Sequence, residues 1–206
     1  MRGKPIDTIH KHDTIRFKTF LEAEMRKLLI GTAIMTIFFC LFLIYNHKQL
    51  PTKEDVYKIS GNWSQKTEEV YLIRKIDEEW LTIFRSSNLT MVSRLEQNWM
   101  GFWEFKDDLR SKTSLISTSY PPETEIDFTW TASGRDDIPI SYYFGHINNP
   151  KIQEIKVEIE KDIFENAIII DTGETRFYFL KSEAPTLLPI NIKGSSETGE
   201  LIYSTL

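Results

Sequence analysis

The chain has 206 residues, which is enough for one ordinary globular domain and a targeting segment. A content of 41% hydrophobic and 27% charged residues excludes disorder as the default interpretation. The charges divide the chain into three parts: residues 1–27 carry a net +3, residues 28–45 carry none, and residues 46–206 carry −8. Because an acidic domain repels phosphates, nucleic acid is not expected as a partner.

The uncharged segment Leu28–Tyr45 predicts a transmembrane helix. Its 18 residues form an α-helix about 27 Å long, close to the thickness of the hydrocarbon core of a bilayer. Seven basic residues precede the segment, whereas only Lys48 and Lys53 follow it closely. By the positive-inside rule, residues 1–27 form a cytoplasmic basic tail, and the C-terminal domain is extracytoplasmic. We therefore expect a single-pass protein of the cell membrane, with the lipid bilayer as one partner.

Three further kinds of apolar segment fit these residues less well. A core helix of a soluble protein rarely runs this far without a charge. A cleavable signal peptide needs small residues after Tyr45, but residues 46–48 are Asn-His-Lys. A lipoprotein needs a small residue before its cysteine, whereas Cys40 follows two phenylalanines. The segment is thus expected to remain as an anchor.

The tail carries apolar residues at helical spacing just before the predicted span. Phe17, Phe20, Leu21 and Met25 recur on one side of a helical wheel, with basic residues elsewhere on it. One interpretation is an interfacial helix whose basic groups lie near anionic lipid, and the other is a docking face for a cytoplasmic partner. The two histidines of the tail lack a third ligand, so no metal site is predicted there.

Residues 46–60 are expected to form a juxtamembrane linker with a short helix. Thr52 is a plausible N-cap for Lys53–Ile59, and Gly61 stops the helix. The only cysteine, Cys40, lies in the predicted span, so the domain that follows has no disulfide. Secreted eukaryotic domains of this size often carry disulfides, and their absence favours a bacterial envelope.

Residues 61–206 predict a mainly β domain. Alternating apolar and polar residues, separated by turn signals, predict about ten short strands. These strands are Val70–Ile76, Glu79–Arg85, Leu89–Leu95, Gly101–Lys106, Ile126–Thr131, Ile155–Glu160, Asn166–Asp171, Thr175–Lys181, Pro189–Lys193 and Glu200–Tyr203. Their number and spacing predict an antiparallel β-sandwich or barrel. The longest break, Asp107–Glu125, is expected to separate two sheets or two subdomains.

Four segments of the last third carry a resemblance to a known group of proteins. They are Gly145–Ile152, Ile155–Val157, Arg176–Phe179 and Gly199–Tyr203. In these segments the chain resembles uncharacterised single-pass envelope proteins of bacilli, which pair an N-terminal anchor with a β ectodomain. The resemblance implies the same topology and a Gram-positive home, and it implies no catalytic residue.

Signatures of enzymes are sparse. Only His146 could serve a Ser-His-Asp triad in the domain; it lies beside Gly145 in an expected turn and is interpreted as a structural or solvated residue. Asp136-Asp137 with Glu123 and Glu125 could bind calcium, but a solvated acidic loop is favoured. Hydrolysis by two carboxylates stays open, because the two acids can lie anywhere in the chain. No catalytic residue, cofactor or metal is predicted.

An aromatic cluster is the best candidate for a ligand or partner platform. Trp99, Phe102, Trp103 and Phe105 fall within seven residues. Strand alternation would put Trp99, Trp103 and Phe105 on one face and Phe102 on the other. Core packing is the simpler interpretation, and a platform for a protein or glycan is the alternative.

These features favour a membrane-anchored envelope protein whose exported β domain is a protein interaction module. One alternative is a transmembrane signalling protein, in which an anti-sigma-like sensor passes the state of the ectodomain to the tail. The other alternative is a cell-wall-modifying enzyme. Another envelope or membrane protein is the expected partner.

Overall fold

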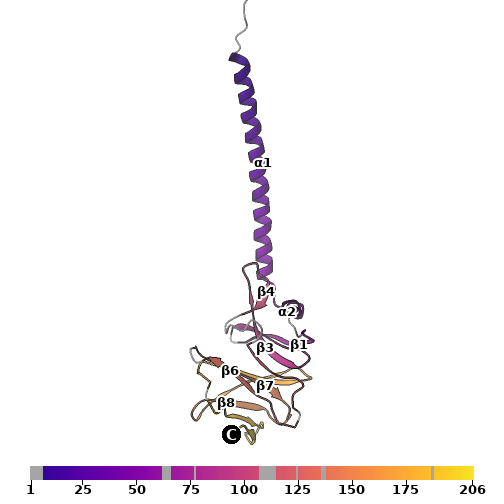
Figure 1. Ribbon diagram of the computed structural model, residues 1–206, viewed down its shortest axis with the longest axis vertical. Helices are drawn as coiled ribbons and strands as arrows, with labels where there is room; N and C mark the ends of the chain where they lie inside the picture. Colours follow the sequence, from indigo (N-terminus) through magenta and orange to yellow (C-terminus); the bar gives the residue numbers. More distant parts are fainter. Residues whose placement is uncertain are drawn as a thin grey trace, which may run out of the picture. The chain divides into compact units, whose positions relative to one another are not determined.

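The structure is a computed structural model with two compact units, each of which is described by itself (Figure 1). It describes the backbone of residues 7–206 except 62–65, 77, 107–114, 124, 136–137 and 187. Side chains are described for the same residues from 24 onward, except 135, 138 and 139. The helix unit comprises residues 1–49 and the turn Trp99–Phe102. The β domain comprises Leu50–Asn98 and Trp103–Leu206.

The helix unit is built on α1 (Asp7–His47), which joins the predicted tail helix and the predicted span without a break. Within it, Glu24–His47 is apolar and long enough to cross a membrane, and none of this stretch is buried. The absence of burial argues against the core helix of a soluble protein. Thr32 and Thr36 each donate a hydrogen bond of 2.9 Å to the carbonyl four residues earlier, which satisfies their hydroxyls within the helix.

The β domain opens with the short helix α2 (Lys53–Ser60). Thr52 is its N-cap, and Thr52 and Asp55 form a reciprocal capping box, with the Asp55 carboxylate accepting from the Thr52 backbone at 2.9 Å. Val56 is fully buried, so that the inner face of this helix is fixed to the domain. The predicted cap, helix and stop at Gly61 are therefore confirmed.

Three antiparallel sheets follow, which confirms the prediction of an antiparallel β domain. The first sheet has the order β1-β2-β3-β4, with β5 also paired to β3. Its strands are β1 (Glu69–Ile76), β2 (Glu79–Arg85), β3 (Leu89–Gln97), β4 (Trp103–Phe105) and β5 (Ile116–Ser119).

The second and third sheets contain the remaining strands. The second has the order β10-β11-β7-β6 and consists of β10 (Ile168–Asp171), β11 (Arg176–Ser182), β7 (Ile138–Ile147) and β6 (Thr131–Arg135). The third has the order β13-β12-β8-β9 and consists of β13 (Leu201–Ser204), β12 (Ile192–Ser195), β8 (Glu154–Glu160) and β9 (Ile163–Asn166).

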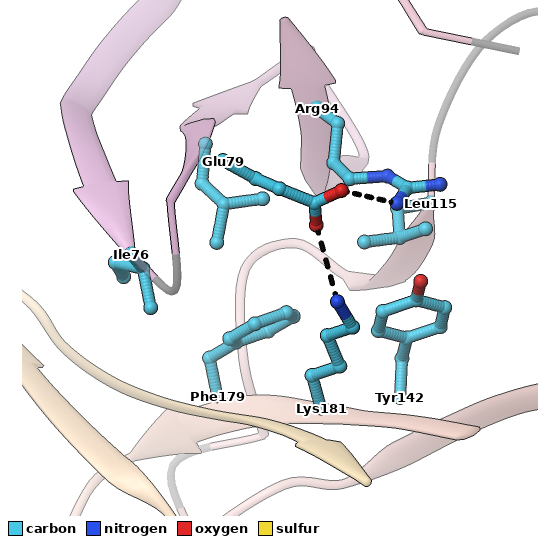
Figure 2. Close-up of a pocket in the computed structure, with 8 residues that line it drawn as sticks. Ile76, Glu79, Arg94, Leu115, Tyr142, Phe179 and Lys181 are labelled. Atoms are coloured by element: carbon cyan, nitrogen blue, oxygen red, sulfur yellow. Dashed lines mark hydrogen bonds and ion pairs between the residues drawn. The ribbon is translucent and has the colours of Figure 1, made fainter. Parts of the chain in front are cut away.

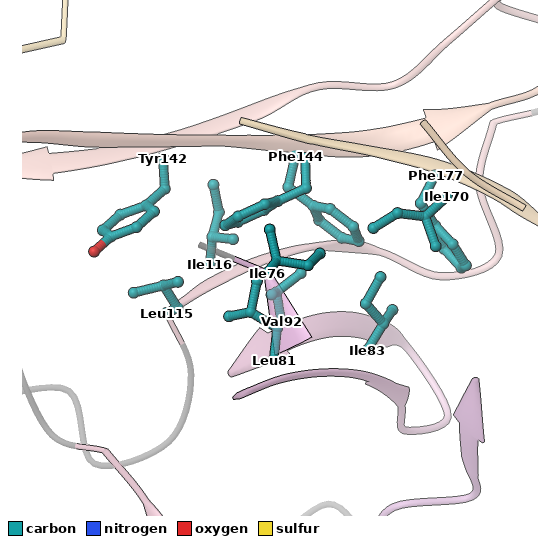
Figure 3. Packing of buried hydrophobic residues seen from close by; sticks show 11 residues of the cluster. Ile76, Leu81, Ile83, Val92, Leu115, Ile116, Tyr142, Phe144, Ile170 and Phe177 are labelled. Atoms are coloured by element: carbon teal, nitrogen blue, oxygen red, sulfur yellow. The ribbon is translucent and has the colours of Figure 1, made fainter. Parts of the chain in front are cut away.

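The sheets are stacked like those of a sandwich, with three sheets in place of two (Figure 1). One apolar core lies between the first and second sheets and includes Ile83, Val92 and Phe144 (Figure 3). A second core lies between the second and third sheets and includes Tyr143 and Ile155. A third covers the other face of the first sheet, where α2 packs. The second sheet is therefore buried on both faces.

Burial on both faces explains the longest strand, β7, which alternation did not predict. Its Tyr142 and Phe144 side chains face the first sheet, whereas Tyr143 faces the third. A strand covered on both sides is apolar at successive positions and has no period-2 signal. The short strands β5, β6 and β9 were not predicted either.

The predicted strand Ile126–Thr131 is wrong for most of its length. Phe128 forms an isolated bridge to Ile147, and regular pairing begins only with β6 at Thr131. Side chains take up part of its backbone hydrogen bonding, since Asn148 Nδ2 donates to the Ile126 carbonyl at 2.9 Å. The alternation still predicted burial correctly at Phe128, which is 1% exposed.

Most of the other predicted strands are confirmed to within a few residues. The break at Asp107–Glu125 contains β5, and it separates the strands of the first sheet from those of the second and third.

Candidate functional site

The β domain has a groove of about 360 Å³ where β2 begins, β3 ends and β4 begins. It is called here the tryptophan groove, and its lining residues are Lys75, Glu78, Glu79, Trp80, Arg94, Leu95, Glu96, Gln97, Trp103 and Lys106. The pairing of β3 with β2 and β4 brings these residues together, with Trp80 opposite Leu95 and Trp103 opposite Gln97.

Two indole rings form the apolar part of the groove. Trp80 and Trp103 meet edge to face, with ring centroids 6.2 Å apart. Both are half-buried and pack against the core that α2 covers. Phe105, two residues along β4, stacks on Phe84 at 5.5 Å and lies in the same core. The groove therefore offers an aromatic surface held rigidly by the core behind it.

The polar part of the groove is a cluster of charges around Glu79. Its carboxylate accepts from Arg94 Nη1 at 2.8 Å and from Lys181 Nζ at 3.5 Å (Figure 2). Lys106 Nζ lies 3.6 Å from the same carboxylate. Burial raises the pKa of the Glu79 carboxyl, but the charges of Arg94 and Lys181 outweigh it, and the pKa lies below its usual range. Glu79 is thus ionised at neutral pH and fixes the positions of the basic side chains.

A smaller pocket lies on the inner side of the same cluster, between the first and second sheets (Figure 2). Phe179 and Lys181 enter it from β11, and Tyr142 enters it from β7, with the Arg94 guanidinium 5.9 Å from the centre of the Tyr142 ring. Burial raises the pKa of the Tyr142 hydroxyl. The pocket has no space for a water molecule, because these groups fill it and join the two sheets.

The four predicted platform residues fall in two different units. Trp103 and Phe105 lie on one face of β4 in the β domain. Trp99 and Phe102 belong to the helix unit and lie in the turn before β4, where their side chains are 73% and 49% exposed. The strand begins at Trp103, so alternation does not extend back to Trp99. A platform made of all four stays a prediction.

The predicted docking face of the tail lies mostly outside the described side chains. Phe17, Phe20 and Leu21 fall in the helical backbone of α1, and nothing is described of their side chains. Met25 is 55% exposed. The docking face stays a prediction.

His146 lies in a strand and not in the predicted turn, and of its two predicted roles, structural or solvated, its burial fits the structural one. It lies in β7, 1% exposed, and its Nε2 is 3.2 Å from the hydroxyl of Thr90 in β3. Burial lowers the pKa of His146 to about 4, because the charged ring cannot be hydrated there. Since Thr90 is also fully buried, the pair is closed to a substrate and connects the first and second sheets.

The carboxylates considered for calcium binding, Asp136, Asp137, Glu123 and Glu125, are only partly described. Asp136 and Asp137 lie outside the described residues, while Glu123 and Glu125 are exposed. Among the residues that are described, no group of three His, Cys, Asp or Glu side chains is placed to hold a metal.

Trp80, Glu79 and Arg94 were not predicted as a site from the sequence. Arg94 was the available signal, because it is the one charged residue between Leu89 and Leu95, a stretch whose other members are apolar or carry hydroxyl groups. An arginine there needs a partner, and the hairpin register supplies Glu79 from β2.

Comparison with known proteins adds no relative: no family model, no curated protein and no solved structure matches the chain.

Proposed function

We propose that the chain is a single-pass membrane protein of a bacterial envelope whose exported β domain binds another envelope or membrane protein. The tryptophan groove is the observation that carries the proposal. It combines two packed indole rings with a charged rim, and tryptophan and arginine are the residues that most often dominate protein interfaces.

The charges of the groove favour a polypeptide over a simple ion. Three basic side chains, Lys75, Arg94 and Lys106, face three acidic ones, Glu78, Glu79 and Glu96. A balanced rim attracts neither anions nor cations strongly, but it can pair with the mixed charges of a peptide segment. An apolar side chain of that segment would lie on Trp80 and Trp103.

The helix unit supports the membrane part of the proposal. The apolar half of α1 exposes large side chains throughout, and a bilayer is the solvent that suits them. The basic excess before the span favours a cytoplasmic N-terminus. A reporter fused after Leu206 is expected to be active only outside the membrane, and cytoplasmic activity would refute the orientation.

In-cell crosslinking of the tagged full-length protein tests the interaction. We expect one reproducible membrane or envelope partner, whose yield falls strongly with Trp103→Ala and with Lys106→Glu. Trp130→Ala removes an exposed tryptophan that is not part of the groove and should leave the yield unchanged. Urea denaturation of both groove variants shows whether a lower yield reflects a folding defect. An unchanged yield in both groove variants would refute the proposal.

A second candidate function, transmembrane signalling, is favoured by the continuity of α1. One helix from Asp7 to His47 joins the tail to the span, so a movement at one end can reach the other. Deleting Arg2–Leu21 should then abolish the response while leaving membrane insertion intact. A tail deletion without any phenotype would favour the plain anchor.

A further inference from the structure

The turn Trp99–Phe102, which leads from β3 into β4, packs against the C-terminal end of α1 within the helix unit. Asn46 Nδ2 donates a hydrogen bond of 3.2 Å to the Met100 carbonyl. The ring of Phe102 meets the ring of Phe42 edge to face, with centroids 6.1 Å apart. One polar and one aromatic contact thus hold the turn beside the last two turns of the helix.

Gly101 makes this close approach possible. Its φ of +82° lies in the left-handed region, which side chains disfavour. A Cβ at this position would lie 2.7 Å from the Asn46 Cβ and 2.9 Å from the backbone nitrogen of His47. The turn is therefore shaped to lie directly on the backbone of the helix end.

The contact with Phe42 fixes the depth of the turn relative to the span. Phe42 lies three residues before Tyr45, the end of the uncharged segment, which is about 4.5 Å along the helix axis. If Phe42 is in the hydrocarbon, then Phe102, which touches its ring, lies at the boundary between hydrocarbon and headgroups. Trp99 and Tyr45 are 73% and 65% exposed in this unit.

We propose that Trp99 and Phe102 insert into the interfacial layer of the bilayer and form, with Tyr45, a second membrane anchor. Indole and phenol groups prefer this layer, because their rings are apolar while their N–H and O–H groups can bond to headgroups or water. The occupant is lipid and not a protein, because Phe102 packs on Phe42 of a helix that is itself apolar and exposed. The inference rests on the proposed membrane span of α1.

The test uses the full-length protein reconstituted in phosphatidylcholine–phosphatidylglycerol vesicles that contain brominated lipids, which quench nearby tryptophans. Cys40, the only cysteine, is exposed on α1 and carries a polarity-sensitive fluorophore that reports insertion of the helix. We expect lipid-like emission from Cys40 and quenching of the tryptophan emission. Trp99→Phe should remove most of the quenchable emission while keeping an aromatic ring in the turn. Trp130→Phe removes a 45% exposed tryptophan of the β domain and should leave the quenchable emission unchanged.

The outcomes separate the anchor from the span. A lipid-like Cys40 probe with quenching that disappears in Trp99→Phe and persists in Trp130→Phe supports the anchor. A lipid-like probe with quenching unchanged by Trp99→Phe overturns the anchor alone, as does an equal loss in the two variants. A water-like Cys40 probe overturns the span, and with it both the proposed function and the anchor. Because the vesicles contain no other protein, a Trp99 that contacts only a protein partner would remain unquenched.

Discussion

The interface between the first and second sheets and the interface between the second and third are held together in different ways. On β3, Thr90, Val92 and Arg94 all face the second sheet, so that a polar residue stands on each side of an apolar one. Thr90 meets His146, and Arg94 meets Glu79, which also contacts Lys181 of β11. The first interface therefore has an apolar middle with polar contacts on either side.

The interface between the second and third sheets relies on close packing. Gly194 of β12 faces Ile152 and Phe128, which occupy the space that a side chain would need. Gly145 of β7 leaves room for the carbonyl of Thr129. Two glycines thus let backbone and large side chains approach where any larger residue would collide.

The difference shows what specifies each interface. Paired charges and hydrogen bonds are satisfied in one arrangement only, so the first interface is specified by its polar contacts as well as by its shape. The second interface is specified by the volume of its residues, because it closes only where two glycines provide no side chain. The first should respond to charge and pH, whereas the second should respond to added atoms.

Gly145→Ala should have the largest effect. The added Cβ would lie 1.9 Å from the Thr129 carbonyl oxygen and 2.8 Å from the ring of Tyr178, so backbone must move. We expect the free energy of unfolding to fall by roughly 3 kcal/mol, the upper end for overpacking. Urea denaturation of the full-length protein in detergent, followed by tryptophan fluorescence, measures it.

Gly194→Ala is the matched control in the same interface. Its Cβ would lie 2.9 Å from Cδ1 of Ile152 and 3.2 Å from the ring of Phe128, and both are side-chain atoms that can shift. A loss of about 1 kcal/mol is expected. A loss at Gly194 equal to that at Gly145 would show that the clash with backbone is not decisive.

His146→Gln should change how stability depends on pH. The pKa of His146 is about 4 in the folded protein and 6.5 without burial, so between these values the unfolded chain binds more protons. The free energy of unfolding should therefore fall as the pH drops from 6.5 to 4, by roughly 3 kcal/mol from this residue. Glutamine does not titrate, and the variant should lose this part of the slope in denaturation curves recorded across that range.

Phe179→Leu is the control for this prediction. The Phe179 ring lies in the same core and stacks on Tyr142, with ring centroids 6.2 Å apart, so its truncation lowers stability but leaves in place Phe144 and Phe177, the rings beside His146. Its slope against pH should match that of the wild type. Parallel slopes for the wild type and His146→Gln would contradict the assignment of the pH dependence to His146.

Glu79→Gln should lower stability by about 2 kcal/mol. The substitution keeps the size of the side chain but removes the negative charge from beside Arg94, Lys106 and Lys181. The loss is moderate because the Glu79 side chain is 25% exposed and water screens part of the interaction. Glu96→Gln, on the exposed rim of the groove, should change stability by less than about 0.5 kcal/mol. Equal effects at the two positions would refute a special role for Glu79.

The contrast between the interfaces also explains which parts of the fold the sequence could predict. Strands with one solvated face, such as β8, alternate cleanly and were found with bounds close to those observed. The hairpin of β10 and β11 was found from Gly173, whose φ is +87°. β7 was missed because both of its faces are buried, and the isolated glycine Gly145 was taken as a turn signal although it makes room for Thr129.

The candidate site was predictable only in part, for a related reason. Trp103 and Phe105 stand out because aromatic residues are dense in one short stretch of sequence. Glu79 and Arg94 are 15 positions apart and meet only because the register of β2 and β3 aligns their ends. Register depends on turn geometry and on which face is buried, and neither is visible in the spacing of charges.

Tyr178→Phe and Tyr143→Phe form the finest comparison, because both tyrosines are fully buried in the second interface. The Tyr178 hydroxyl donates a hydrogen bond of 3.1 Å to the Thr129 carbonyl, the same oxygen that Gly145 leaves room for. Its removal should cost about 1 kcal/mol, since the partly buried carbonyl loses a donor. The Tyr143 hydroxyl has no hydrogen-bond partner among the described residues, so its removal should be neutral or stabilising. Urea denaturation of the two variants side by side measures the difference, and an equal loss would mean that the hydrogen bond to Thr129 contributes no more than the packing of a hydroxyl group.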